Sequence, residues 1–272
     1  LSIKGVGSYL IGEHNERINY EITNKDGNLK FQSEININKN QLHIGFLNYK
    51  KKENKESILF IDGEYQKDKT LIFKKISLNE SENNFLIDNL SLSKDLKINY
   101  FKLIDLYFIN ENKKNNEIFL KRDKKNYLVS SKIFDGSSFL DNILTGDNDE
   151  SIFRFFENLN SKFKINIDKV FMDDINFLRS LKSDIKFKKN NLVNLNLSGN
   201  FADNKKLALT IRTNENNEKI TTFVAENAKP FVKKYKFIKG FEEGYLDFYS
   251  IKKNNISKSK LKINDFKLKE VP

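Results

Sequence analysis

The stretch that decides the fold is INYEITNKDGNLKFQSEINI, residues 18–37. Its first half alternates Ile18, Tyr20 and Ile22 with polar residues, and its second half alternates in the same way. Between the halves lies Asp26-Gly27, a pair that tolerates the positive φ angles of a tight hairpin turn. Because successive side chains of a strand point to opposite faces, the stretch predicts a β-hairpin with one apolar and one polar face. The apolar positions of the second half are Leu29, Phe31, Ile35 and Ile37.

The same alternation recurs along the whole chain. Turns rich in Asn, Lys and Glu, such as residues 50–56, 79–84 and 214–218, separate the alternating stretches. This pattern predicts a mainly β, antiparallel chain. Nearly every predicted strand has one apolar and one strongly polar face, which suits a long curved sheet whose apolar face forms an elongated groove. Two such sheets packed together also satisfy the pattern, and periodicity alone does not choose between them.

Short helices are predicted in the C-terminal half. Residues 137–144 place Phe139 and Ile143 on one stripe, as in an amphipathic helix. Residues 227–237 have the same spacing, with Pro230 tolerable in the first turn.

Internal boundaries are suggested by changes in composition. The acidic linker at residues 146–150 and the loop at residues 110–116 are the best candidates. Residues 151–158, which contain three Phe, are a third candidate helix after that linker.

The composition excludes several kinds of chemistry. The chain has no Cys and two His among 272 residues, which removes thiolate metal sites, Cys nucleophiles, disulfides and any three-histidine cluster. The net charge is +11, from 48 Lys and Arg against 37 Asp and Glu, but only five of the bases are Arg. Nucleic-acid surfaces favour Arg for bidentate contacts. The abundance of Lys, Asn, Ile and Phe is typical of AT-rich coding, so we expect a solvated Lys-rich surface and no nucleic-acid partner.

No set of catalytic residues can be named. Asp173 and Asp174 are adjacent, so on a strand their carboxylates diverge, and a turn role is favoured. Asp135 precedes a Gly and a predicted helix, which is the place of a turn or N-cap residue. His14 and His43 are isolated in polar, strand-rich contexts, which indicates surface or edge positions. We therefore expect a protein that is not an enzyme and has no catalytic residue, no bound metal and no cofactor.

Three stretches carry a resemblance. They read NEIFLKRDKKNYLVSSKIFDGSSFLDNIL (116–144), FVAENAKPFVKKYKFIKGFEEGYL (223–246) and LKINDFKLKEVP (261–272). In this order and spacing they resemble the C-terminal region of AsmA-like proteins, and the likeness spans roughly residues 85–272. The chain departs from the family pattern at Asn227-Ala228-Lys229, where Asp-Ala-Gly is usual, and at Glu243-Gly244, where Gly-Gly is usual.

The resemblance implies a bridge-like lipid transport protein of the Gram-negative cell envelope. Residues 1–110 would be a repetitive β-groove segment, and residues 111–272 the AsmA-like C-terminal region. Such a protein moves phospholipids between the inner and outer membranes through a hydrophobic groove in the periplasm. Its partners would be phospholipid acyl chains and components of both membranes, reached through further segments of a longer chain. An N-terminal helix, absent from residues 1–272, would anchor it in the inner membrane.

The candidate residues that line the groove are the apolar positions of the predicted strands. They are Phe31, Ile35, Ile37, Phe163, Ile165, Ile167, Leu195, Leu197, Leu207, Leu209, Ile211, Leu246, Phe248, Leu261 and Ile263. The same positions would form an ordinary sealed core in the alternative hypothesis, a structural or adhesin-like β-domain with an interaction role. Neither hypothesis needs a group that gives or takes a proton.

Overall fold

The computed structural model of the chain describes residues 1–11, 13–67, 70–137, 156, 158–234, 239–254 and 256–269. The fold is mainly β, with 70% strands and almost no helix. Seventeen strands form one large, curved, mostly antiparallel sheet, and two short strands form a separate ribbon. The described helices are the 3-10 helix η1 (Gly45–Leu47) and α2 (Lys229–Lys234).

The strands follow one another closely along the chain. The first nine are β1 (Ser2–Ile11), β2 (His14–Lys25), β3 (Asn28–Asn36), β4 (Leu42–Ile44), β5 (Tyr49–Lys51), β6 (Ser57–Tyr65), β7 (Leu71–Glu80), β8 (Asn83–Leu92) and β9 (Ile98–Tyr100). The next five are β10 (Leu103–Ile109), β11 (Asn115–Asp123), β12 (Asn126–Asp135), β13 (Lys162–Phe171) and β14 (Phe177–Lys188). The last five are β15 (Asn191–Phe201), β16 (Lys206–Thr213), β17 (Lys219–Ala225), β18 (Phe241–Lys253) and β19 (Ile256–Leu268).

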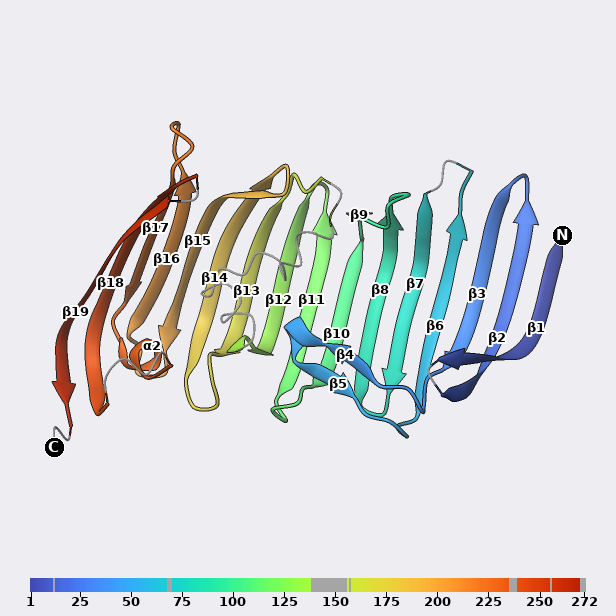
Figure 1. Cartoon of the computed structure of the whole chain (residues 1–272), viewed down its shortest axis with the longest axis horizontal. Helices are drawn as coiled ribbons and strands as arrows, with labels where there is room; N and C mark the ends of the chain where they lie inside the picture. The colour runs from blue at the N-terminus through green and yellow to red at the C-terminus, as the bar shows by residue number, and fades with distance from the viewer. Residues whose placement is uncertain are drawn as a thin grey trace.

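The large sheet is a meander in which each strand pairs with the next along the chain. Figure 1 shows the strands side by side from β1 at one end to β19 at the other. β3 pairs with β6, which leaves β4 and β5 outside the sheet, and β8 pairs with both β9 and β10. The pair β12–β13 is parallel, whereas the other pairs are antiparallel. The sheet therefore confirms the predicted mainly β class. It also contains one parallel strand pair, β12–β13, which periodicity does not reveal.

The register places the predicted apolar positions on one side of this sheet. Ile35 is opposite Leu59, and Ile165 lies between Val129 and Ser183 on the neighbouring strands. We call the side that carries Ile35 and Ile165 the apolar face and the other side the polar face. On the polar face Lys164 is opposite Asp184, as expected for a wet surface.

Register shifts interrupt strict alternation at four places in the described sheet, among them one on β14 and one between β6 and β7. Between Arg179 and Lys182 the pairing of β14 with β15 slips, and Ser180 has a φ of 51°. Leu178 (2% exposed) and Leu181 (8% exposed) are both buried although they are three residues apart on β14. A second slip lies at Asp62/Gly63 between β6 and β7. Each bulge keeps apolar residues on the apolar face where strict alternation would turn them outward.

β4 and β5 lie outside the main sheet. Leu42 and Ile44 alternate like the strands of that sheet, but they belong to a two-stranded ribbon. In Figure 1 this ribbon lies in front of the main sheet, over the strands near its middle. Its Leu47 and Tyr49 pack against the sheet residues Leu78 and Phe85. The ribbon is apolar on one side because it covers the sheet.

The structure describes one of the predicted helices and one of the predicted boundaries. α2 lies within the 227–237 range, whereas residues 138–144 and most of 151–158 lie outside the described residues. The boundary placed between residues 110 and 111 falls in the turn that joins β10 to β11, which are paired neighbours in the sheet. The linker at 146–150 also lies outside the described residues.

Replacing Gly63 by Val tests the bulge between β6 and β7. A Cβ at Gly63 would lie 2.7 Å from the carbonyl oxygen of Ile72 and 2.7 Å from the ring of Phe31, so the chain must shift to admit it. We expect Gly63→Val to lower the free energy of unfolding by about 1–3 kcal/mol. Gly7→Val is the matched control, because its nearest contact would be Ile18 Cγ2 at 3.8 Å. Equal urea midpoints for the two variants would contradict this assignment.

Candidate functional site

The candidate site is the apolar face, built from rows of side chains that cross neighbouring strands in register. One row runs through Val129, Ile165, Ser183, Leu197, Leu209, Phe223, Phe248 and Leu261. The next runs through Gly199, Leu207, Ala225, Leu246 and Ile263. Directly opposed side chains in a sheet lie close enough to pack, so each row is a nearly unbroken apolar strip across the strands.

The N-terminal strands continue this face. One row runs through Ile18, Ile35, Leu59, Leu78, Phe85, Leu106 and Ile118. Phe31 lies opposite Gly63, where the missing side chain leaves room for its ring, and it contacts Phe73 edge-on at a centroid distance of 6.0 Å. Apolar rows therefore cross the sheet from β2 to β19.

Among the described residues, three elements cover parts of the apolar face. The β4–β5 ribbon packs on β7, β8 and β10, the segment with Phe156 and Leu159 packs on Phe163, and α2 packs on β16 and β18. Figure 1 shows the ribbon and α2 on the same side of the sheet. The apolar clusters under these covers share Phe134, Ile104 or Ile165 with one another, so they are contiguous along the face.

The predicted lining residues differ in exposure. Phe163, Leu195, Leu207 and Leu246 are buried, and Leu261 on the last strand is 49% exposed. The others are partly buried: Phe31, Ile35, Ile37, Ile165, Ile167, Leu197, Leu209, Ile211, Phe248 and Ile263. Most of the face is therefore neither sealed like a core nor bare like a surface.

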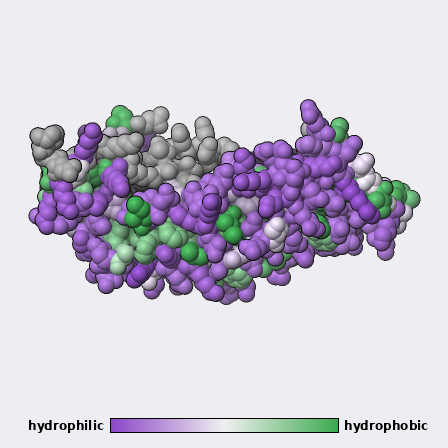
Figure 2. Space-filling model, turned by 90° about the horizontal axis from the view of Figure 1, so that it is seen from below, coloured by the Kyte–Doolittle hydropathy of each residue, from purple (hydrophilic) through white to green (hydrophobic). Residues whose placement is uncertain are grey.

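The polar face is hydrophilic with local exceptions. Rows such as Asn166–Lys182–Ser198 are exposed on this face. Seen from below, along the strands, the visible surface is mostly hydrophilic, with smaller apolar patches (Figure 2). The exceptions are three apolar side chains of β10 to β12 that are about 40% exposed: Tyr107, Phe119 and Leu128. β1 adds two exposed apolar residues to this face, Val6 and Leu10, which lie opposite Asn19 and Asn15 of β2.

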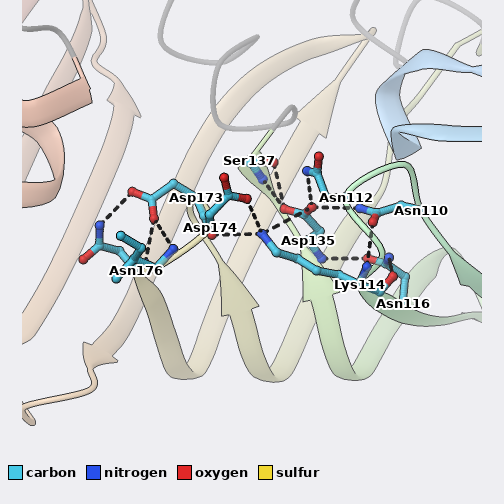
Figure 3. Close-up of polar contacts among 10 residues, drawn as sticks. Asn110, Asn112, Lys114, Asn116, Asp135, Ser137, Asp173, Asp174 and Asn176 are labelled. Atoms are coloured by element: carbon cyan, nitrogen blue, oxygen red, sulfur yellow. Dashed lines mark hydrogen bonds and ion pairs between the residues drawn. The ribbon is translucent and has the colours of Figure 1, made fainter.

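A buried polar network ties strand ends together beside the parallel joint (Figure 3). The Asp135 side chain, at the end of β12, accepts hydrogen bonds from Asn110 Nδ2 at 2.7 Å and Asn112 Nδ2 at 2.9 Å. Lys114 Nζ lies 3.7 Å from Asp135 and donates to the carbonyl oxygen of Asp173 at 3.0 Å. The turns after β10 and β13 are thus fastened to the end of β12.

Asp135 and Asp173 have turn roles of the kind that the sequence predicts. The Asp135 Oδ1 accepts from the backbone N–H and the hydroxyl of Ser137, and Asp173 Oδ1 accepts from the backbone of Ile175 and Asn176. Asp174 is 88% exposed in its side chain and lies 3.4 Å from Lys114 Nζ. The partners of these carboxylates are amides, a hydroxyl and an ammonium group. The network therefore has a structural role: it holds the ends of neighbouring strands together.

The network also sets the ionisation of Asp135. Burial raises the pKa of this carboxyl, but hydrogen bonds from Asn112, Ser137 and Asn110 outweigh burial and leave the pKa lowered. The pKa of Asp173 is lowered in the same way: burial raises it, and the hydrogen bonds from Asn176 and Ile175 outweigh that. Both carboxylates are charged in the folded protein near neutral pH.

No three His, Cys, Asp or Glu side chains among the described residues are placed to hold a metal ion. His43 is exposed on β4, and His14, at the start of β2, is partly buried. No helix among the described residues is long and apolar enough to cross a membrane.

Comparisons with protein-family models, with curated proteins and with solved structures find no match to this chain. The geometry of the apolar face therefore carries the functional argument.

Replacing Asp135 by Ala tests the network. The change leaves Lys114 and two amides without their buried acceptor, and we expect it to lower the free energy of unfolding by about 3–5 kcal/mol at pH 7. Because the folded-state pKa of Asp135 is lowered, its contribution is present above the unfolded pKa of about 3.9 and is lost as the pH falls through the folded value.

The control for this prediction is Asp174→Asn, which removes the exposed partner of the same Lys114. We expect little change from it. Urea unfolding at pH 7 and at acid pH measures both variants. A loss for Asp135→Ala that is no larger than that for Asp174→Asn, or that grows on acidification, would show that the network does not hold the joint.

Proposed function

We propose that this chain binds phospholipid acyl chains along its apolar face and carries them across the sheet without enzymatic chemistry. The observation that carries the proposal is the continuity of the face, since apolar rows cross the strands from β2 to β19 in register. The resemblance to AsmA-like proteins supplies the setting: transport between the inner and outer membranes, in the periplasm, by a protein anchored at the inner membrane.

The energetics of lipid transfer require such a surface. Each CH₂ group moved from water to an apolar environment gains about 0.8 kcal/mol, so an acyl chain leaves a bilayer only for a comparably continuous apolar lining. Partly buried residues of the face that belong to none of the three buried clusters, such as Leu209 and Ile211, provide this lining without a polar group that fixes a chain in place. Weak specificity and low barriers along the face suit sliding transport.

The covers favour a division of the face into stable and accessible parts. Buried clusters beneath the β4–β5 ribbon and α2 hold the sheet folded. The strips between the covers keep partly exposed apolar side chains that an acyl chain can contact. In this proposal the covers leave part of the face open to lipid.

A second function follows from the same covers. If covering elements seal the whole face, the chain is a structural or adhesin-like β-domain with an interaction role, and its apolar rows are a core. The buried clusters under the ribbon, the Phe156 segment and α2 favour this alternative locally.

Lipid occupancy distinguishes the two functions. We expect the chain, expressed in a Gram-negative host and purified without detergent, to carry phospholipid in native mass spectrometry and to take up a fluorescent acyl probe. A folded protein that carries no lipid and takes up no probe would contradict transport and favour the structural role.

Two neighbouring positions on β16 give a matched pair of variants. Leu209 is partly buried, whereas Leu207 is 5% exposed within the cluster under α2. We expect Leu209→Asp to weaken probe binding at least tenfold, which is about 1.4 kcal/mol, while the protein still melts cooperatively. Leu207→Asp buries an unpaired charge and should abolish the cooperative melt. Unfolding by both variants would indicate a sealed core.

A further inference from the structure

The apolar face changes character at one end of strands β16 to β19. Beyond its two apolar rows comes a mixed row, Ile211, Thr221, Ser250 and Ser259. The next row on the same face is fully polar: Thr213, Lys219, Lys252 and Ser257. The face thus passes from hydrocarbon through hydroxyl groups to ammonium groups, which is the polarity profile of an amphiphile with an anionic head.

Among the described residues, the two lysines of the last row have no anionic partner. Lys219 and Lys252 are directly opposed on β17 and β18, an arrangement of like charges that costs stability. The nearby Glu218 accepts from Asn214 Nδ2 at 2.9 Å and pairs with Lys253 Nζ at 3.4 Å. Within the part of the chain that the structure describes, neither Lys219 nor Lys252 forms an ion pair.

A cavity of about 410 Å³ lies beside this row, between the β14–β15 and β16–β17 turns. Its lining is made of three lysines, two asparagines, one threonine and two apolar residues: Lys188, Lys189, Asn191, Leu192, Val193, Thr213, Asn217 and Lys219. No carboxylate is among the described residues that line it. Ammonium, amide and hydroxyl groups are hydrogen-bond donors to phosphate oxygens, and hydrogen bonds to a charged acceptor are the stronger kind.

The environment of Lys219 disfavours its charged form, so an anion beside it would be stabilising. Lys219 is partly buried although it is a lysine, and burial, followed by the charge of Lys252, lowers the pKa of its ammonium. An anion in the cavity would offset both effects by pairing with the charged form.

The cavity is joined to the apolar face. Leu192 lines the cavity and packs against the apolar cluster that contains Phe163. Thr213 lines it too, and lies two residues from Ile211 on the same face of β16. A group held in the cavity therefore has hydrocarbon-binding residues within one strand repeat.

We propose that this cavity holds the phosphate group of a phospholipid whose acyl chains lie on the adjoining apolar rows. The inference rests on the proposed function for the chains, and it adds a fixed polar station at one end of the strands. A lipid is then oriented with its head toward the β14–β15 and β16–β17 turns and its chains toward α2.

Fluorescence titration with two acyl-labelled lipids tests the headgroup. Phosphatidylglycerol carries an anionic phosphoglycerol headgroup that diacylglycerol with the same chains lacks, and inorganic phosphate is titrated separately by calorimetry. We expect the full chain to bind phosphatidylglycerol roughly tenfold or more tightly than diacylglycerol. In K188Q/K189Q/K219Q this preference should disappear while the diacylglycerol affinity stays.

The matched control is K258Q/K260Q/K262Q, which removes the same charge from β19 positions that pair with the polar face of β18. It should keep the preference. Equal binding of both lipids by the unaltered chain, or an equal loss in the control, would overturn the phosphate site and leave the proposed function standing. Binding of neither lipid would overturn the proposed function. Binding of inorganic phosphate alone, lost in the first variant, would identify a free anion as the occupant and overturn the headgroup.

Discussion

The register between neighbouring strands is the constraint on which the rest of the structure depends. Paired residues share a face of the sheet. A register shift of one residue would therefore move all the apolar side chains of a strand to the polar, solvent-exposed face. The sequence departs from strict alternation near Ser180 and Gly63. Bulges at these places keep the following apolar side chains on the apolar face. The large sheet stays single, so its apolar rows meet short covering elements and not a second large sheet. A long surface of partly buried hydrocarbon follows directly from that arrangement.

The covers and the polar network serve the same sheet in different ways. The β4–β5 ribbon, the Phe156 segment and α2 bury apolar clusters that pay back the conformational entropy of ordering long strands. The network around Asp135 and Lys114 secures the ends of strands beside β12–β13, where the parallel pair cannot be closed by a tight hairpin. Stability is thus concentrated at a few places, and the strips between them can serve binding.

Much of the sheet could be predicted from alternation, and the exceptions have physical causes. The predicted lining residues that lie in strands, from Phe31 to Ile263, share one face of the sheet. They do so because apolar and polar residues alternate within each strand and the register pairs apolar with apolar positions. The ribbon at Leu42 and Ile44 could not be told from a sheet strand, because a cover and a strand both need one apolar side. The bulge at Ser180 and the parallel joint depend on pairing between strands, which a single sequence does not contain. The lysine cavity arises from two turns brought together by the meander, and only the register reveals Lys219 opposite Lys252.

The central claim is that hydrocarbon contacts one face of this sheet. The most direct measurement is photo-crosslinking of a phospholipid with a diazirine in its acyl chain, followed by mapping of the modified residues by mass spectrometry. The account predicts crosslinks at apolar-face positions such as Ile167, Leu209 and Ile211, and none at polar-face positions such as Lys164 and Asn196. Crosslinks spread over both faces, or none on a folded and lipid-exposed protein, would contradict it.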